Sequence, residues 1–136
     1  MREIKFRGYL KDSFFKGKEE HPSYEPLLNK RIVKIHSIHF NSKKVIISCP
    51  TGGNMSVEFK DIELMQYTGL KNKAGQEIYE GDILREYSNE IEDWIVTYEY
   101  GEFIGTNDNV CEDLYELSDL DVIGNIYESE KENEYR

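Results

Sequence analysis

Short runs of alternating hydrophobic and polar residues recur along the chain and predict β-strands. In the first run, Ile4 and Phe6 alternate with charged residues, which indicates an edge strand with one buried face over residues 2–10. Later runs are rich in β-branched and aromatic residues and end at turns of Gly, Asn, Ser and Pro. The strands expected from these later runs cover residues 32–40, 45–49, 55–59, 83–87, 94–100 and 122–127.

Four segments break this alternation. Residues 11–31 are polar and contain one glycine and two prolines, which predicts an irregular loop or a mobile arm. Residues 112–120 place three leucines at helical spacing, so we expect one short helix there. Residues 61–67 fit either a strand or a helical turn, and residues 68–79 fit a hairpin or a wide loop.

The near-regular spacing of the short strands predicts a mostly β fold with a short helix, arranged as a barrel or a sandwich. A parallel α/β sheet is not expected, because no strand alternates with a helical pattern of about 10–15 residues. A chain of 136 residues is long enough for one domain or for two small subdomains.

The composition argues against several classes of protein. No run reaches the roughly 18 apolar residues of a membrane span, and the N-terminus lacks the apolar region of a signal peptide. The two cysteines, Cys49 and Cys111, are too few for a disulfide framework or for a zinc site built from thiolates. We therefore expect a protein of the reducing cytoplasm with no membrane partner.

Charge divides the chain into two unlike parts. Residues 1–85 carry 15 Lys and Arg against 11 Asp and Glu, whereas residues 86–136 carry 2 against 16. The acidic part repels phosphate, so we expect no nucleic-acid partner. An acidic surface aids solubility. It is also suited to a basic surface, either the N-terminal part of a second copy or a basic host protein.

The ten tyrosines exceed what a core of this size needs. Tyr is enriched where one end of the side chain is dry and the other is wet. At strand spacing these aromatic residues fit either the core or an interface, and the excess favours an interface for part of them. The candidate interaction surface consists of Tyr79, Tyr87, Trp94, Tyr98 and Tyr100. With the opposite charges of the two parts, it predicts a homo-oligomer.

Glu77, Glu80 and Asp82 are the strongest candidates for catalytic chemistry, because neighbouring carboxylates can bind a hard cation or act as acid and base. Their segment lacks the Asp-x-Asp-x-Asp-Gly pattern of a calcium loop. A structural role fits better, in which Gly81 allows a bend and Asp82 braces it through backbone hydrogen bonds. We therefore predict no catalytic residue, no metal and no cofactor.

Three segments of the chain stand out by their order and spacing: Met1–Arg7 at the start, Gln66–Ile83 in the middle and Val122–Glu128 near the end. Together they resemble the YopX family of small phage and prophage proteins. The resemblance implies a β-rich fold with an SH3-like barrel in its C-terminal part, and it implies no activity, substrate or catalytic residue. It also implies that the compartment is the cytoplasm of an infected or lysogenic bacterial host.

With the resemblance, the predicted organisation is an N-terminal β-rich subdomain over residues 1–60, an SH3-like barrel over residues 61–128 and a charged tail over residues 129–136. The function predicted first is a non-enzymatic protein-interaction module. One alternative is an acidic decoy that mimics nucleic acid and occupies a host protein. A second alternative is a small hydrolase that uses the carboxylates around Gly81.

Overall fold

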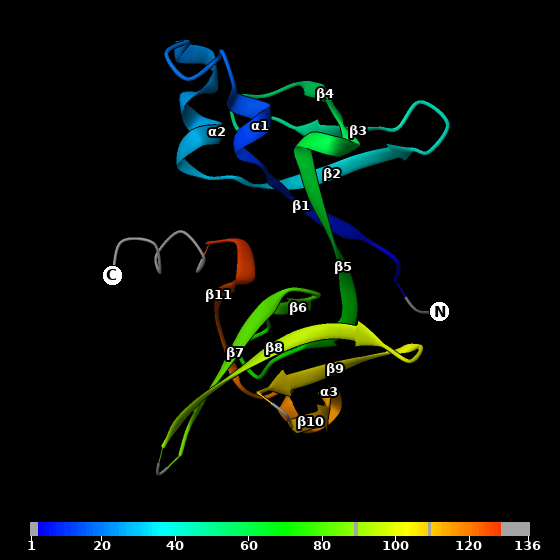
Figure 1. The fold of residues 1–136 in the computed structure, drawn as a ribbon, viewed down its shortest axis with the longest axis vertical. Coiled ribbons are helices and arrows are strands. Elements are labelled where there is room, and N and C mark those ends of the chain that lie inside the picture. The colour runs from blue at the N-terminus through cyan, green and yellow to red at the C-terminus, as the bar shows by residue number, and fades with distance from the viewer. Residues whose placement is uncertain (1–2, 89, 109, 129–136) are drawn as a thin grey trace. The chain divides into compact units, whose positions relative to one another are not determined.

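The computed structural model describes residues 3–88, 90–108 and 110–128, and most of them lie in β-strands (Figure 1). They form two sheets with the strand orders β4-β3-β2-β1-β5-β6 and β10-β9-β8-β7-β11, joined by a few short helices. The chain folds as two compact units. The N-terminal unit is Lys5–Met65, and the C-terminal unit is the described part of Gln66–Arg136 together with the start of the chain. The mostly β fold class is confirmed.

The elements are short, as their residue ranges show. The strands are β1 (Phe6–Leu10), β2 (Ile32–His39), β3 (Lys44–Ser48), β4 (Asn54–Glu58), β5 (Ile62–Lys71), β6 (Glu77–Tyr79), β7 (Asp82–Tyr87), β8 (Ile91–Glu99), β9 (Glu102–Asn107), β10 (Val110–Asp113) and β11 (Asp121–Asn125). The helices are α1 (Asp12–Phe15), α2 (Glu25–Asn29) and α3 (Leu114–Leu117), with 3-10 turns η1 (Pro22–Tyr24) and η2 (Phe59–Asp61).

The N-terminal unit has its core between the sheet and the segment that joins β1 to β2. That segment, residues 11–31, was predicted as a loop or mobile arm, and this prediction is wrong. It forms α1, η1 and α2, which bury Phe14, Phe15 and Leu27 against the alternating apolar residues of β3 and β4. The polar composition concealed these helices, because the few apolar residues of the segment give no helical period but are enough to anchor two short helical turns in the core.

The first strand is also placed differently from the prediction. β1 lies between β2 and β5 in the middle of its sheet, so it is not an edge strand. Gly8 makes the packing around β1 possible, because a Cβ atom there would lie 2.5 Å from Ile62 Cδ1 and 3.1 Å from Ile35 Cδ1. Alternation along one strand reports which face is buried, but it does not report how many strands lie beside it.

The C-terminal unit has its core between the five-stranded sheet and α3. Leu84, Trp94 and Val96 point to this side, and Leu114 and Leu117 of α3 cover them. The helix is shorter than the predicted 112–120, because the residues before it pair with β9 as β10. Among the described residues the sheet ends at β10 and β11, so these strands form no closed barrel.

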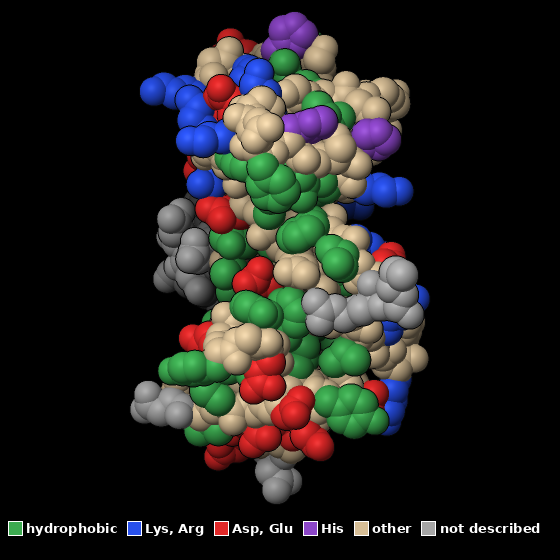
Figure 2. Space-filling view, turned by 90° about the vertical axis from the view of Figure 1, so that its right-hand side faces the viewer, with side chains coloured by type: hydrophobic (Ala, Val, Ile, Leu, Met, Phe, Trp, Pro, Cys, Tyr) green, Lys and Arg blue, Asp and Glu red, His purple; other side chains and the backbone are tan. Residues whose placement is uncertain are grey.

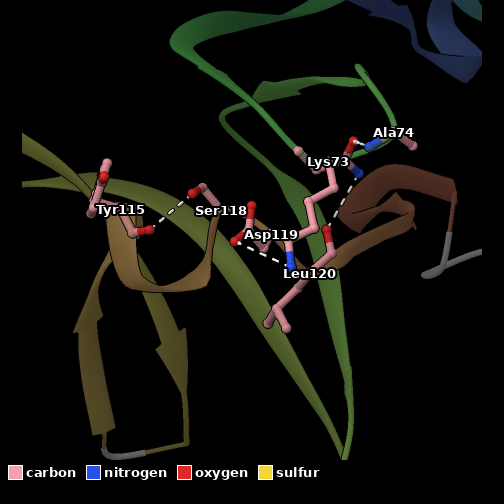
Figure 3. A network of polar contacts seen from close by, with 7 residues as sticks. Lys73, Ala74, Tyr115, Ser118, Asp119 and Leu120 are labelled. Atoms are coloured by element: carbon pink, nitrogen blue, oxygen red, sulfur yellow. Dashed lines mark hydrogen bonds and ion pairs between the residues drawn. The ribbon is translucent and has the colours of Figure 1, made fainter.

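A buried asparagine, Asn72, fixes the loop between β5 and β6. Figure 3 shows Lys73 and Ala74 of this loop beside Asp119 and Leu120. The Asn72 side-chain oxygen accepts hydrogen bonds from the backbone N–H groups of Ala74 and Gln76, both at 3.0 Å. Its amide nitrogen donates to the carbonyl of Leu120 at 3.3 Å. Lys73 adds an ion pair with Asp119, 3.9 Å away. The loop is therefore tied to the segment that follows α3.

A second polar junction connects β6, β7 and β8. Gly81 has a φ of 90°, donates its N–H to the carbonyl of Val96 at 2.8 Å and accepts from the N–H of Ile126 at 2.9 Å. Asp82 is fully buried, and its carboxylate accepts from the N–H of Tyr79 at 2.7 Å. The predicted bend at Gly81 and the brace by Asp82 are thus confirmed.

We predict that Gly81→Val lowers the free energy of unfolding by about 1–3 kcal/mol, because a β-branched residue resists a positive φ. Urea unfolding measures this change. Gly53→Val is the matched control, since Gly53 has a φ of 76° in a turn where a Cβ atom meets nothing within 4 Å. Gly81 is buried, so its substitution should cost more than the control. Equal stability of Gly81→Val and the wild type would contradict the prediction.

Candidate interaction surface

Two of the five residues predicted to form the interaction surface lie in the core. Tyr79 is 8 % exposed and Trp94 is 6 % exposed. Trp94 belongs to the cluster under α3, and the Tyr79 ring packs against Tyr67 with 5.4 Å between the ring centroids. The prediction that these two side chains line a surface is therefore wrong. Strand spacing gave no means of separating them from the others, because core and interface aromatics follow the same alternation.

The other three predicted residues are exposed, but they do not form one strip. Tyr98 lies on the Trp94 face of β8 and packs edge-to-face on Phe103 of β9, with 4.9 Å between the centroids. Tyr100 occupies the turn between β8 and β9 with a φ of 54° and is fully exposed. Tyr87, 62 % exposed, belongs to the opposite face of the sheet.

Tyr87 pairs with a residue that the sequence analysis did not select. Ile91 lies directly across from it at the end of the β7–β8 hairpin and is 65 % exposed. In the described part of the chain, pairing of β9 with β8 stops at Ile95, and pairing of β11 with β7 stops at Arg85. The residues between these two points and the end of the hairpin pair only with each other. The hairpin therefore ends as a two-stranded projection (Figure 1). We call Glu86, Tyr87, Ile91 and Glu92 the hairpin arm.

A signal for Ile91 is present in the sequence. It follows the turn after β7 and is out of phase with Trp94, Val96 and Tyr98, so alternation assigns it to the other face of β8. The candidate surface was chosen from aromatic residues, so the aliphatic Ile91 was not selected. The cross-strand partner of Tyr87 depends on the register of the hairpin, which the structure supplies.

The other face of the hairpin arm is acidic. Glu86 and Glu92 lie directly opposite each other. A second facing pair, Glu99 and Glu102, flanks the turn between β8 and β9. Like charges directly opposite destabilise a strand pair, and a two-stranded ribbon is only marginally stable in water. The arrangement is chemically suited to contact with a cationic surface that would screen these carboxylates.

The same sign of charge extends over the whole C-terminal unit. Residues 66–128 carry 16 Asp and Glu against 3 Lys and Arg, whereas Lys5–Met65 carries 7 against 11. Figure 2 shows Asp and Glu side chains gathered on the C-terminal unit and Lys and Arg side chains on the N-terminal unit. An exposed apolar pair on an acidic background is thus the distinctive feature of the hairpin arm.

Two of the three candidate catalytic carboxylates, Glu77 and Asp82, form hydrogen bonds within the local fold, whereas Glu80 binds through its backbone N–H to the carbonyl of Gln66. The Asp82 carboxylate accepts a hydrogen bond from the backbone N–H of Tyr79, and the Glu77 carboxylate accepts one from the Tyr79 hydroxyl at 3.2 Å. Among residues 3–88, 90–108 and 110–128 no group of three or more His, Cys, Asp or Glu side chains is placed to hold a metal ion. The segment around Gly81 therefore acts as a junction between strands.

The fold and these surfaces can now be compared with known proteins. A family model described as "YopX protein" matches residues 15–131. The chain belongs to the YopX family. This confirms the resemblance to the family, and the match contains two of the three segments that carried it, Gln66–Ile83 and Val122–Glu128. No curated protein matches the chain.

One solved structure is similar to this YopX family member over almost its whole length. It is the crystal structure of protein EF1440 from Enterococcus faecalis, with a TM-score of 0.55 and 23 % sequence identity. The match covers 96 % of this chain and 97 % of EF1440. At this identity the similarity shows a shared fold.

Two remaining expectations for this YopX family member concern its boundaries and its membrane relations. The predicted boundary between residues 60 and 61 stays a prediction, and the charged tail, residues 129–136, lies outside the described residues. No helix in the described part of the chain is long and apolar enough to cross a membrane.

A bidentate ion pair supports the base of the hairpin arm. Arg85 Nε and Nη2 donate to the two carboxylate oxygens of Asp93 at 2.7 and 3.0 Å. Arg85 and Asp93 lie directly opposite each other. They are two residues along each strand from Tyr87 and Ile91, so the two pairs share one face. The hydrogen bonds from Arg85 hold the pKa of Asp93 below its usual value, and Asp93 raises the pKa of Arg85.

We predict that Asp93→Asn lowers the Tm slightly at neutral pH and leaves it unchanged in acid. Because folding lowers the pKa of Asp93, its contribution is present above the unfolded-state pKa of about 4 and is lost as pH falls through the folded-state value. Thermal unfolding from pH 7 to pH 3 measures the effect. Glu112→Gln, at an exposed position of β10, is the control. A difference in Tm that persists at low pH would refute this account.

We predict that Asp82→Ala lowers the free energy of unfolding by about 1–3 kcal/mol, because it leaves the buried Tyr79 N–H without its acceptor. Asp82→Asn should lose less, since its amide oxygen can still accept. Urea unfolding of both variants separates the hydrogen bond from the charge. Equal losses in the two variants would show that the charge, and not the acceptor, matters.

Proposed function

We propose that this YopX family member is a non-enzymatic protein-interaction module and that the hairpin arm is its contact element. The observation that carries the proposal is the exposed pair Tyr87 and Ile91 on a projecting ribbon. Large apolar side chains on a projection are costly in water, and Tyr is enriched in interface cores. The proposal includes the absence of an enzymatic activity and a cytoplasmic location.

The charge around the arm supports a basic partner. The facing carboxylates Glu86 and Glu92 repel each other in the free protein, and a cationic surface would relieve that repulsion. Oppositely charged patches also raise the rate of encounter and exclude partners of the wrong charge. We infer that the partner presents lysine or arginine side chains beside an apolar contact.

The five-stranded sheet has two free edges among the described residues, at β10 and β11. An SH3-like, partly open arrangement of these strands is part of the proposal, and it is compatible with a five-stranded antiparallel sheet covered by α3. Such a scaffold would hold the base of the hairpin rigid while its end projects, which suits an element that binds another protein.

One observation favours a second candidate function. The carboxylates of residues 66–128 far outnumber the cations, which is what a decoy that imitates nucleic acid would need. Binding by such a decoy would depend on many charges and would survive loss of the apolar pair. The hydrolase alternative has less support, because the Asp82 carboxylate is fully buried and bonded to backbone.

The test compares the immobilised wild-type chain with a Tyr87→Ser, Ile91→Ser double variant. Bacterial lysate proteins retained by each are identified by mass spectrometry, and retention of a labelled copy of the chain is measured in parallel. We expect the double variant to lose at least nine-tenths of a specifically retained protein, about 1.4 kcal/mol or more.

Tyr115→Ser is the matched control, because Tyr115 is 73 % exposed but lies on α3. It should retain the same proteins as the wild type. Identical retention by the wild type and the double variant would overturn the hairpin arm as the contact element. If retention then also falls steeply with salt, the decoy becomes the better explanation.

A further inference from the structure

The turn between β2 and β3 is the counterpart of the hairpin arm in the N-terminal unit. Phe40 lies in this turn and is 74 % exposed, which is high for a large hydrophobic side chain. Its ring packs edge-to-face on Phe59, with 6.1 Å between the centroids, so its position is supported from one side. The other side is open to solvent.

A shallow hollow adjoins Phe40. It has a volume of about 360 Å³ and is lined by His39, Phe40, Asn41 and Ser42. The His39 ring is held by a hydrogen bond between its Nε2 and the Ser37 hydroxyl at 2.9 Å. The hollow is open to solvent and lined by one short stretch of chain, so it offers a shallow contact for a partner side chain and not an enclosed pocket.

Two lysines adjoin the hollow. Lys43 is the last residue of the turn and Lys44 is the first residue of β3, and both are exposed. Glu58 of β4 lies directly across from Lys44. The Lys43 backbone has a φ of 54°, and its carbonyl accepts from the N–H of Phe59 at 2.9 Å, which fixes the path of the turn. The turn therefore presents an aromatic ring, a hollow and two lysines together. The hairpin arm presents an aromatic ring, an isoleucine and two glutamates.

From this complementarity we propose that the β2–β3 turn of one copy binds the hairpin arm of a second copy, with Tyr87 and Ile91 against Phe40 and the hollow. Glu86 and Glu92 lie on the opposite face of the ribbon, so their attraction to Lys43 and Lys44 acts around its edge and adds to the apolar contact. This inference rests on the proposed function, because it names the partner of the arm. The opposite net charges of the two units favour the encounter.

The observations favour a second copy over single-stranded nucleic acid, although an aromatic ring beside lysines is a feature of both kinds of site. Two lysines can neutralise few phosphates, and the same chain carries a strongly acidic unit that repels a polyanion. A second copy supplies an arm with two carboxylates, of which Glu92 is exposed and Glu86 is half-buried.

The experiment measures molar mass by light scattering at roughly 10–100 µM protein, where contacts with micromolar Kd are populated. The wild type should exceed the mass of one chain, 16.0 kDa, and should approach it as salt is raised. Lys43→Glu with Lys44→Glu, the turn variant, should be monomeric. Glu86→Lys with Glu92→Lys, the arm variant, should also be monomeric. In each of the two double variants, the Kd of self-association should rise at least tenfold.

An equimolar mixture of the turn variant and the arm variant gives the decisive result. The acidic turn of one then meets the basic arm of the other, so association should return. Matched controls with the same charge change are Lys16→Glu with Lys30→Glu and Glu112→Lys with Glu116→Lys, all at exposed positions away from the two elements. Both controls should associate as the wild type does.

Three outcomes would overturn the inference: a wild type of 16.0 kDa at every concentration, controls as defective as the variants, or a mixture that stays monomeric. A wild type that binds an oligothymidylate probe, with binding lost in the turn variant, would instead assign the turn to nucleic acid. If the wild type is monomeric but loses a retained lysate protein on Tyr87→Ser with Ile91→Ser, only this inference fails and the proposed function stands.

Discussion

The buried junction at Gly81 and Asp82 is the constraint on which the C-terminal unit depends. Gly81 connects through its backbone to β8 and to the segment after β11, while Asp82 binds the backbone of β6 and pairs with Asn125 of β11. A carboxylate without exposure is costly unless hydrogen bonds satisfy it, so these partners fix one another. Two of the three segments that identify the family, Gln66–Ile83 and Val122–Glu128, meet at this point.

Away from this junction the sheet narrows to the two strands β7 and β8. β7 and β8 are held by β11 and β9 near Asp82, and beyond Arg85 and Ile95 they pair only with each other in the described structure. The Arg85–Asp93 ion pair lies where the support of the other strands ends. The hairpin arm past it combines an exposed apolar pair with facing glutamates, and neither feature stabilises an isolated ribbon. Local rules of stability are broken there, as is common where a protein meets a partner.

Each unit has its own apolar core, and the surfaces around the two cores carry opposite net charges. Exposed aromatic residues occur on both, Phe40 beside lysines and Tyr87 beside glutamates. Surface charge contributes little to the fold itself, since exposed ion pairs are weak and screened by salt. Charge of this kind acts mainly on which surfaces attract each other, and the proposal of a protein-interaction module draws on that difference between the units.

The sequence by itself determined the mostly β class, most strands, the bend at Gly81, the brace at Asp82 and the family, because alternation, glycine and turn residues act over short distances. Tertiary structure alone decided that residues 11–31 bury Phe14 and Phe15 in helices and that β1 is central. It also separated buried Trp94 from exposed Tyr87 and gave Tyr87 its partner Ile91. Burial and register depend on which distant strands lie beside a residue, and no local pattern contains that information.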